Sequence, residues 1–189
     1  MTDRERIAMA EWSAALRAGK CRRRRFMRWA AGVGVLGCVL GLTIIAPPSP
    51  WLVWNVSASA PLGLYRVSNI GDLARGDMVI ARVPMRWRTW AARRHYIPAN
   101  VPLVKRVAAL PGDLICAAAR SLWVNGKLVV ERRMVDGAGR AMPSWSGCVR
   151  LQPGEYLLLM DSPSSFDGRY FGVSAKADLV GKAVLLWRR

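Results

Sequence analysis

The sequence predicts a mainly β domain preceded by one N-terminal transmembrane helix. Two observations lead to this fold class. Residues 29–46 form an uncharged apolar stretch directly after a run of arginines, and the residues that follow fall into short runs rich in Val, Leu and Ile. A chain of 189 residues has about the length of one domain with an appendage, and an apolar content of 52% is enough to build a packed core.

The stretch at 29–46 (WAAGVGVLGCVLGLTIIA) has the length and composition of a membrane-spanning helix. Its 18 residues carry no charge and are close to the shortest length that crosses a bilayer as a helix. Residues 1–28 hold nine Arg or Lys against three acids and end in an arginine cluster from Arg22 to Arg28. Because positive flanks stay in the cytoplasm, we expect a cytoplasmic segment at 1–28, an anchor at 29–46 and a periplasmic domain at 47–189.

Three other interpretations of the N-terminal residues remain open. A buried core helix would normally show a polar stripe, which this stretch lacks. A cleaved secretory signal needs a permissive cleavage position, whereas Ala46 is followed by two prolines. The net charge of +17 indicates anionic partners, which include nucleic acid. Since no nucleic-acid motif accompanies the charge, we expect inner-membrane lipid as the partner of the arginine cluster.

The domain at 47–189 shows a strand pattern. Asn125-Gly126 predicts a two-residue hairpin turn, because both residues tolerate positive φ. Residues 85–98 show no clear period and are predicted to form a loop or lid. The predicted strands are short runs bounded by Gly, Pro, Asn or Asp, at residues 77–83, 101–109, 114–118, 122–124, 128–130, 156–160 and 182–187.

The four cysteines divide according to this topology. Cys21 falls in the cytoplasmic segment and Cys38 in the span, where both are expected to stay reduced. Cys116 and Cys148 fall in the domain on the oxidising side of the membrane and are the candidates for one disulfide. Two buried free thiols are the alternative, since the sequence does not give their separation.

The single histidine, His95, restricts the kinds of active site that the chain can build. A zinc site needs several His or Cys ligands, and a Ser/His/Asp triad needs a histidine base. We therefore expect neither a metal nor another cofactor. A lysine can serve as the base if burial keeps its amine neutral. Of the four lysines after the anchor, Lys105 lies inside an apolar strand pattern, on the same face as Leu103 and Val107.

The candidate nucleophile lies in residues 55–66, shortly after the anchor. Ser57 and Ser59 have small neighbours there, and Pro61 and Gly63 predict a turn. Small neighbours leave the two hydroxyls accessible to a substrate. Serines beside prolines are also common turn formers, so this segment alone does not distinguish a nucleophile from a turn residue.

The domain after the anchor contains three further motifs, at residues 59–65 (SAPLGLY), 105–113 (KRVAALPGD) and 165–172 (SFDGRYFG). In order and spacing, these segments resemble the sequence boxes of type I signal peptidases, the peptidase S26 family. Three boxes together are far more specific than one, and they extend over nearly all of the domain after the anchor. Their form is most similar to that of the TraF-like conjugal transfer peptidases, and it implies a signal-peptidase-like β fold. Gly168 departs from the pattern, where Ser is usual, and so does Val173, where Pro is common.

The resemblance also implies roles for individual residues. Ser59 is similar in place to the nucleophile and Lys105 to the general base. Ser57, together with the backbone N–H of Ser59, is similar in place to the oxyanion hole. Asp167 is similar in place to the aspartate that organises the site. The change to Gly168 removes one hydroxyl that would otherwise be available to the lysine amine.

The expected function is that of a serine peptidase with a lysine base, anchored in the bacterial inner membrane. The resemblance to the conjugation branch implies a membrane-bound precursor as substrate, a propilin whose processing ends in hydrolysis or cyclisation. Two alternatives remain: a general signal peptidase I, and a catalytically silent, membrane-anchored assembly protein. In the silent protein, Ser59 would be a turn residue, Lys105 a strand lysine paired with an acid, and Asp167 a turn cap.

Overall fold

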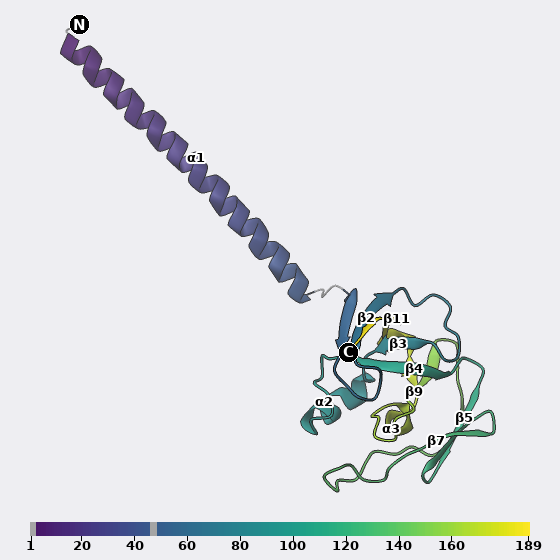
Figure 1. Ribbon diagram of the computed structural model, residues 1–189. Coiled ribbons are helices and arrows are strands. Elements are labelled where there is room, and N and C mark those ends of the chain that lie inside the picture. Colours follow the sequence, from purple (N-terminus) through teal and green to yellow (C-terminus); the bar gives the residue numbers. More distant parts are fainter. Residues whose placement is uncertain (1–2, 46–48) are drawn as a thin grey trace. The chain divides into compact units, whose positions relative to one another are not determined.

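The computed structural model describes residues 3–45 and 49–189, and the chain divides into two units at residues 49 and 50 (Figure 1). The first unit is one helix, α1 (Asp3–Ile45). The part from Arg22 to Ile45 is the one helix in the described residues that is long and apolar enough to cross a membrane. The helix starts well before the predicted span, because arginine and alanine are good helix formers and continue it. The predicted last residue, Ala46, lies outside the described residues.

The second unit, residues 50–189, is built from two antiparallel sheets, which confirms the mainly β fold class. The larger sheet has seven strands in the order β1-β2-β11-β3-β4-β9-β10, and the smaller has four in the order β7-β6-β5-β8 (Figure 1). The strands are β1 (Leu52–Asn55), β2 (Gly63–Ser68), β3 (Met78–Ala81), β4 (Leu103–Ala109), β5 (Leu114–Ala118), β6 (Ser121–Val124), β7 (Lys127–Glu131), β8 (Gly147–Arg150), β9 (Glu155–Leu159), β10 (Ser174–Ala175) and β11 (Leu179–Arg188). The helices are α2 (Met85–Arg93), α3 (Gly168–Phe171) and the 3₁₀ helix η1 (Lys176–Asp178).

Each of the seven predicted runs corresponds to a strand, namely β3, β4, β5, β6, β7, β9 and β11. Asn125 and Gly126 form the turn of the β6–β7 hairpin with φ of 50° and 80°, as their residue types predict. The strands β1, β2, β8 and β10 are additional to the prediction. They are short or mix Trp, Asn and Arg with apolar residues, so their period is weak.

Residues 85–93 form α2, so the prediction of a loop is wrong there. Trp87, Trp90 and Ala91 fall on one face of the helix, with spacings of three and four. Ala91 is fully buried, and the two tryptophan rings meet edge to face with centroids 5.8 Å apart. The apolar period lasts only two turns, and packing against the rest of the domain stabilises a helix that would be marginal alone.

The central strand β4 is buried on both faces, which sets the environment of its lysine. Val104 packs with Ile80 in one buried cluster, and Val107 packs with Val79 in another. Lys105 points to the same side as Val107, because side chains alternate along a strand. A lysine in such surroundings is costly unless it is neutral or well paired.

A disulfide ties the edge of the smaller sheet. Cys116 of β5 and Cys148 of β8 are direct partners in the antiparallel ladder and are joined by this bond, 32 residues apart in sequence. Closing a loop of this length contributes about 4 kcal/mol in the chain-entropy picture. β8 is exposed along its whole length and gains little stability from burial. The disulfide to β5 therefore stabilises its position in the sheet. Cys38 is a free, exposed cysteine, and the side chain of Cys21 lies outside the described part.

Candidate active site

The two candidate serines lie in the turn between β1 and β2, and one buried side chain holds this turn from inside. Asn55, the last residue of β1, is 7% exposed. Its side-chain amide donates to the carbonyl oxygens of Ser57 (3.0 Å), Ala60 (3.2 Å) and Pro61 (3.0 Å). Its Oδ1 accepts from the backbone N–H of Ser57 at 3.1 Å. Asn55 therefore fixes the backbone that carries Ser57 and Ser59, a role that the sequence analysis missed.

Lys105 reaches this turn from the middle of β4. Only 2% of the residue is exposed, and its Nζ donates to Ser59 Oγ at 3.2 Å and to Ser165 Oγ at 2.7 Å. The ion pairs among the described residues of the domain do not include Lys105. Burial lowers the pKa of the amine from 10.5 to about 8, against the charge of Asp167, which raises this pKa, and with that of Arg169, which lowers it.

Ser165 is the second partner of the lysine, and the sequence analysis assigned it no role. It lies in the connection 160–167 between β9 and α3 and is 1% exposed. Its hydroxyl supplies the contact to the lysine amine that the change to Gly168 was expected to remove. The available signal was its place as the first residue of the third box, next to the assigned Asp167.

Gly168 has a steric reason to lack a side chain. A Cβ at this position would lie 2.8 Å from the carbonyl oxygen of Leu158 and 2.9 Å from Cδ1 of Leu157. Both atoms belong to buried residues of the strand β9, and close packing around them leaves no space into which they could move to admit a side chain. The domain therefore has no room for a serine side chain here without a shift, and the hydroxyl comes from Ser165 instead.

Asp167 and Arg169 form a fully buried ion pair beneath this connection. Both side chains are 0% exposed, with Arg169 Nε 2.8 Å from Asp167 Oδ1. Asp167 also accepts from the backbone N–H groups of Met160 (3.0 Å) and Arg169 (3.1 Å), and so caps α3. Arg169 donates to the carbonyl oxygens of Met160 and Pro163. The pair fixes both ends of the segment that presents Ser165, and Asp167 acts on Lys105 through its charge and not by direct contact.

Ser57 lies beside the candidate nucleophile. Its Oγ is 3.0 Å from Ser59 Oγ and accepts from the backbone N–H of Ser59 at 3.4 Å. The two groups expected to form the oxyanion hole are thus adjacent, and they are bonded to each other.

These groups open into a cavity of about 530 Å³. Its walls are mostly apolar, and the segment after α2 closes one side, with His95 and Tyr96 among the lining residues. A cavity of this size can enclose a short stretch of an extended peptide. Among the residues that the structure describes, no group of three or more His, Cys, Asp or Glu is arranged to hold a metal ion.

Comparisons with known proteins identify the family of this chain. The chain matches the family model described as signal peptidase, peptidase S26, over residues 23–188. The conjugal transfer protein TraF of Agrobacterium fabrum is 34% identical over 162 residues, 80% of this chain and 90% of that protein. A plasmid transfer protein TraF of Escherichia coli is 32% identical over 146 residues, 70% of this chain and 82% of that protein. A signal peptidase I of Enterococcus faecalis with a known crystal structure is 22% identical, with a TM-score of 0.36 over 60% of this chain and 98% of that one. The chain belongs to the signal peptidase family, peptidase S26.

Proposed function

We propose that this chain is a membrane-anchored serine peptidase of the signal peptidase type that acts in conjugation and uses Lys105 as its general base. One observation carries the proposal. The Nζ of a lysine that is 2% exposed lies 3.2 Å from the Oγ of Ser59, at the wall of a cavity large enough for a peptide. This pairing supplies an activated nucleophile without a histidine.

The proposed mechanism is acyl transfer through an ester on Ser59. Neutral Lys105 accepts the proton of the Ser59 hydroxyl as Oγ attacks the carbonyl carbon of the scissile peptide bond. The charge that develops on the carbonyl oxygen is stabilised by the Ser59 N–H and the Ser57 hydroxyl. Protonated Lys105 then donates to the leaving amine, and the C–N bond breaks. Water attacks the ester with Lys105 again as the base, which releases the carboxylic acid and restores the hydroxyl.

Two further residues support the base in this mechanism. Ser165, with its Oγ 2.7 Å from Nζ, holds the amine toward Ser59 and accepts a hydrogen bond in both protonation states. Asp167 keeps the connection 160–167 in place and supplies a negative charge that offsets part of the effect of burial on the lysine pKa. Both act through Lys105, so we regard them as positioning residues.

The rate is expected to rise with pH through about pH 8. Only the neutral amine accepts a proton, and burial lowers the pKa of Lys105 to about 8. A group with that pKa is neutral in about a tenth of molecules at pH 7 and about nine-tenths at pH 9. We expect kcat/KM on a peptide substrate to increase over this interval and then level off. A profile that is flat from pH 7 to 9 would assign the base to another group.

Replacing Asn55 by Asp is expected to lower kcat about a hundredfold. The change turns two N–H donors into a carboxylate that faces three carbonyl oxygens, so the turn must shift, and small displacements of a nucleophile cost about this much. Asn69 is exposed, and Asn69→Asp makes the same chemical change as a matched control. Steady-state kinetics on both variants measure the effect. If Asn55→Asp keeps the kcat of Asn69→Asp, the amide does not position the nucleophile.

The proposed topology has residues 1–28 in the cytoplasm, 29–46 in the inner membrane and 47–189 in the periplasm. The arginine cluster from Arg22 to Arg28 precedes the apolar part of α1, as expected for a cytoplasmic flank in contact with anionic lipid. The Cys116–Cys148 disulfide suits an oxidising compartment. Trp51 and Trp54 are exposed just after the span, where indoles favour the head-group region.

We propose a membrane-bound, propilin-like precursor as the substrate. Two of the relatives are named for conjugal or plasmid transfer, which supports a role in conjugation. An enzyme and a substrate that are both held in the membrane meet at a high effective concentration, which gives the anchor a purpose. The acyl-enzyme ester is open to attack by water or by an amine of the substrate, so the product is either linear or cyclic.

Co-expression with pilin precursors and intact-mass measurement of the products tests this function. Processing by the unmodified chain but not by Ser59→Ala is the expected result, and a cyclic product is lighter than the trimmed linear chain by one water. Secretory precursors fused to an ordinary signal sequence form the second arm. Processing of those alone would identify a general signal peptidase I, and processing of neither would identify a silent assembly protein.

A further inference from the structure

Three side chains separate the candidate active site from a second cavity. Tyr96, Ser164 and Phe166 line both the 530 Å³ cavity that holds Ser59 and Lys105 and a smaller cavity of about 140 Å³. We call these three residues the partition. Because the partition lines both cavities, its position sets the boundary between them and so the width of the larger one. A ring that turned away from Ser59 would open the larger cavity toward the smaller one.

The Tyr96 ring is held by a carboxylate on the far side of the partition. Asp136 lies in the connection 132–146 between β7 and β8, and its side chain is 7% exposed. The Tyr96 hydroxyl donates to Asp136 Oδ2 at 2.5 Å, and Arg140 Nε donates to the same oxygen at 2.7 Å. These hydrogen bonds lower the pKa of Asp136, so the carboxylate stays charged and keeps accepting. We call Tyr96, Asp136 and Arg140 the clasp.

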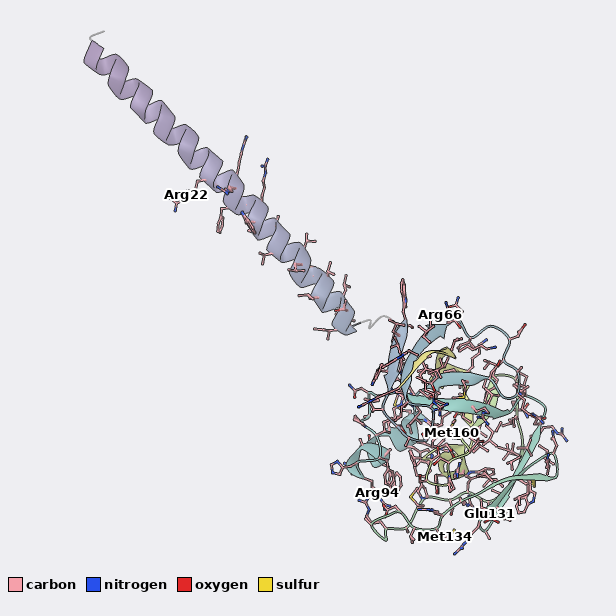
Figure 2. All side chains as sticks on the ribbon, in the orientation of Figure 1. Arg22, Arg66, Arg94, Glu131, Met134 and Met160 are labelled. Carbon is pink, nitrogen blue, oxygen red and sulfur yellow. A yellow bond between two sulfur atoms is a disulfide. The ribbon has the colours of Figure 1, made fainter. Side chains whose placement is uncertain are left out.

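A second set of bonds holds the same two segments together. Arg94, the C-cap of α2, donates from Nη1 to the carbonyl oxygen of Ala141 at 2.6 Å, and its own carbonyl oxygen accepts from Arg140 at 3.3 Å. The Arg94 guanidinium also lies 4.4 Å from the centre of the Trp90 ring. In Figure 2, Arg94 and Met134 lie at the end of the domain opposite Arg66. Hydrogen bonds thus hold the connection 132–146 against the segment after α2, which lines the active-site cavity.

The clasp is linked to the reacting groups through aromatic packing. The Tyr96 ring contacts Phe166 with centroids 5.2 Å apart, and Phe166 also stacks near Trp90 at 6.0 Å. Phe166 follows Ser165 directly in the chain, and Ser165 bonds Lys105 at 2.7 Å. Phe166 of the partition is therefore the chain neighbour of a residue that bonds the lysine, and it lines the same cavity as Ser59.

We propose that the clasp determines which side chains the active site accepts beside the scissile bond, with Tyr96 as the specificity-determining wall and Asp136 as its positioning residue. The inference rests on the proposed peptidase function. With the clasp closed, Tyr96 and Phe166 keep the cavity narrow and favour a small side chain such as alanine. Without the hydrogen bond to Asp136, the Tyr96 ring is free to move toward the 140 Å³ cavity, and a bulkier substrate side chain fits.

The test uses the full-length chain in detergent micelles and two internally quenched peptides that differ only by alanine or leucine on the amino side of the cut. The measured quantity is the ratio of kcat/KM for the alanine peptide to that for the leucine peptide. This ratio does not depend on the fraction of active enzyme, so partial unfolding of a variant does not change it. We expect the ratio to fall about tenfold in Asp136→Ala and by a smaller factor in Tyr96→Phe, since one side-chain misfit in an apolar pocket is worth roughly 10–200-fold.

Asp77→Ala is the matched control, because it removes an ion pair of similar geometry, with Lys182 at 2.8 Å, from residues that do not line the cavity. Its ratio should equal that of the unmodified chain. An unchanged ratio in both Asp136→Ala and Tyr96→Phe, or an equal fall in Asp77→Ala, overturns the inference while leaving the peptidase intact. If the unmodified chain cuts neither peptide nor any precursor, the proposed function fails and the inference fails with it. Should Asp136→Ala not fold, Tyr96→Phe decides, since it removes a single oxygen.

Discussion

Replacing Lys105 by Met is expected to lower kcat/KM by at least about a thousandfold, because the variant keeps the buried apolar stem and loses the base. The amine is the group within 3.2 Å of Ser59 Oγ that can take its proton, and without it the hydroxyl is a weak nucleophile. Ser59→Ala should cause a loss of similar size. The double variant should be no worse than either single one, because nucleophile and base act as a unit.

The matched control for this change is Lys127→Met, which removes a lysine from an exposed position on β7. It should process precursors at the normal rate. Lys105→Met is expected to fold at least as stably as the unmodified chain, because a buried amine is replaced by an apolar group of similar length. Thermal unfolding therefore separates loss of chemistry from loss of structure. Processing that persists in folded Lys105→Met would reject the lysine as the base.

Replacing Asp167 by Ala is expected to lower the free energy of unfolding by about 3–5 kcal/mol. The change leaves the guanidinium of Arg169 at 0% exposure without its carboxylate, and it removes the cap of α3 and the acceptor for the Met160 N–H. Denaturant unfolding of the full chain measures the effect. Activity should fall as well, since the connection that presents Ser165 loses its support.

Two comparisons sharpen the Asp167 experiment. Asp161→Ala breaks the ion pair with Arg106. The side chain of Asp161 is 79% exposed, and exposed pairs contribute roughly 0–1 kcal/mol. Adding Arg169→Met to Asp167→Ala removes the stranded charge and should recover part of the lost stability. If Asp167→Ala lowers the free energy of unfolding by no more than Asp161→Ala does, the buried pair does not stabilise the segment that presents Ser165.

The sequence predicts those parts of the fold whose signals are local. Strands such as β4 and β5 have continuous apolar runs, and the turn at Asn125-Gly126 needs residues that tolerate positive φ. α2 escaped prediction because its period lasts two turns and depends on packing around Ala91. The strands β1 and β2 carry polar residues among apolar ones, since they lead into the turn that holds the serines.

The candidate site shows the same division between local and distant signals. Lys105 stands out through its apolar strand pattern and Ser59 through its turn segment, and the box motifs along the chain imply their roles and that of Asp167. Ser165 meets Lys105 across 60 residues of sequence, and only the folding of the connection 160–167 over the Asp167–Arg169 pair brings them together. The three carbonyl oxygens around Asn55 are likewise backbone atoms, which leave no trace in a residue pattern.

The strand order determines the stage of synthesis at which the hairpin beside Ser59 and the strand that carries Lys105 are joined in one sheet. β11 lies between β2 and β3, so the ladder of backbone hydrogen bonds from the hairpin that carries the serines to the strand that carries the lysine runs through β11. β11 follows every other strand along the chain, and it is therefore made last. In a chain whose synthesis has not yet reached β11, the hairpin beside Ser59 and the strand that carries Lys105 are not yet joined in one sheet. Under the proposed function, we therefore expect the peptidase to become active only after β11 has joined the sheet.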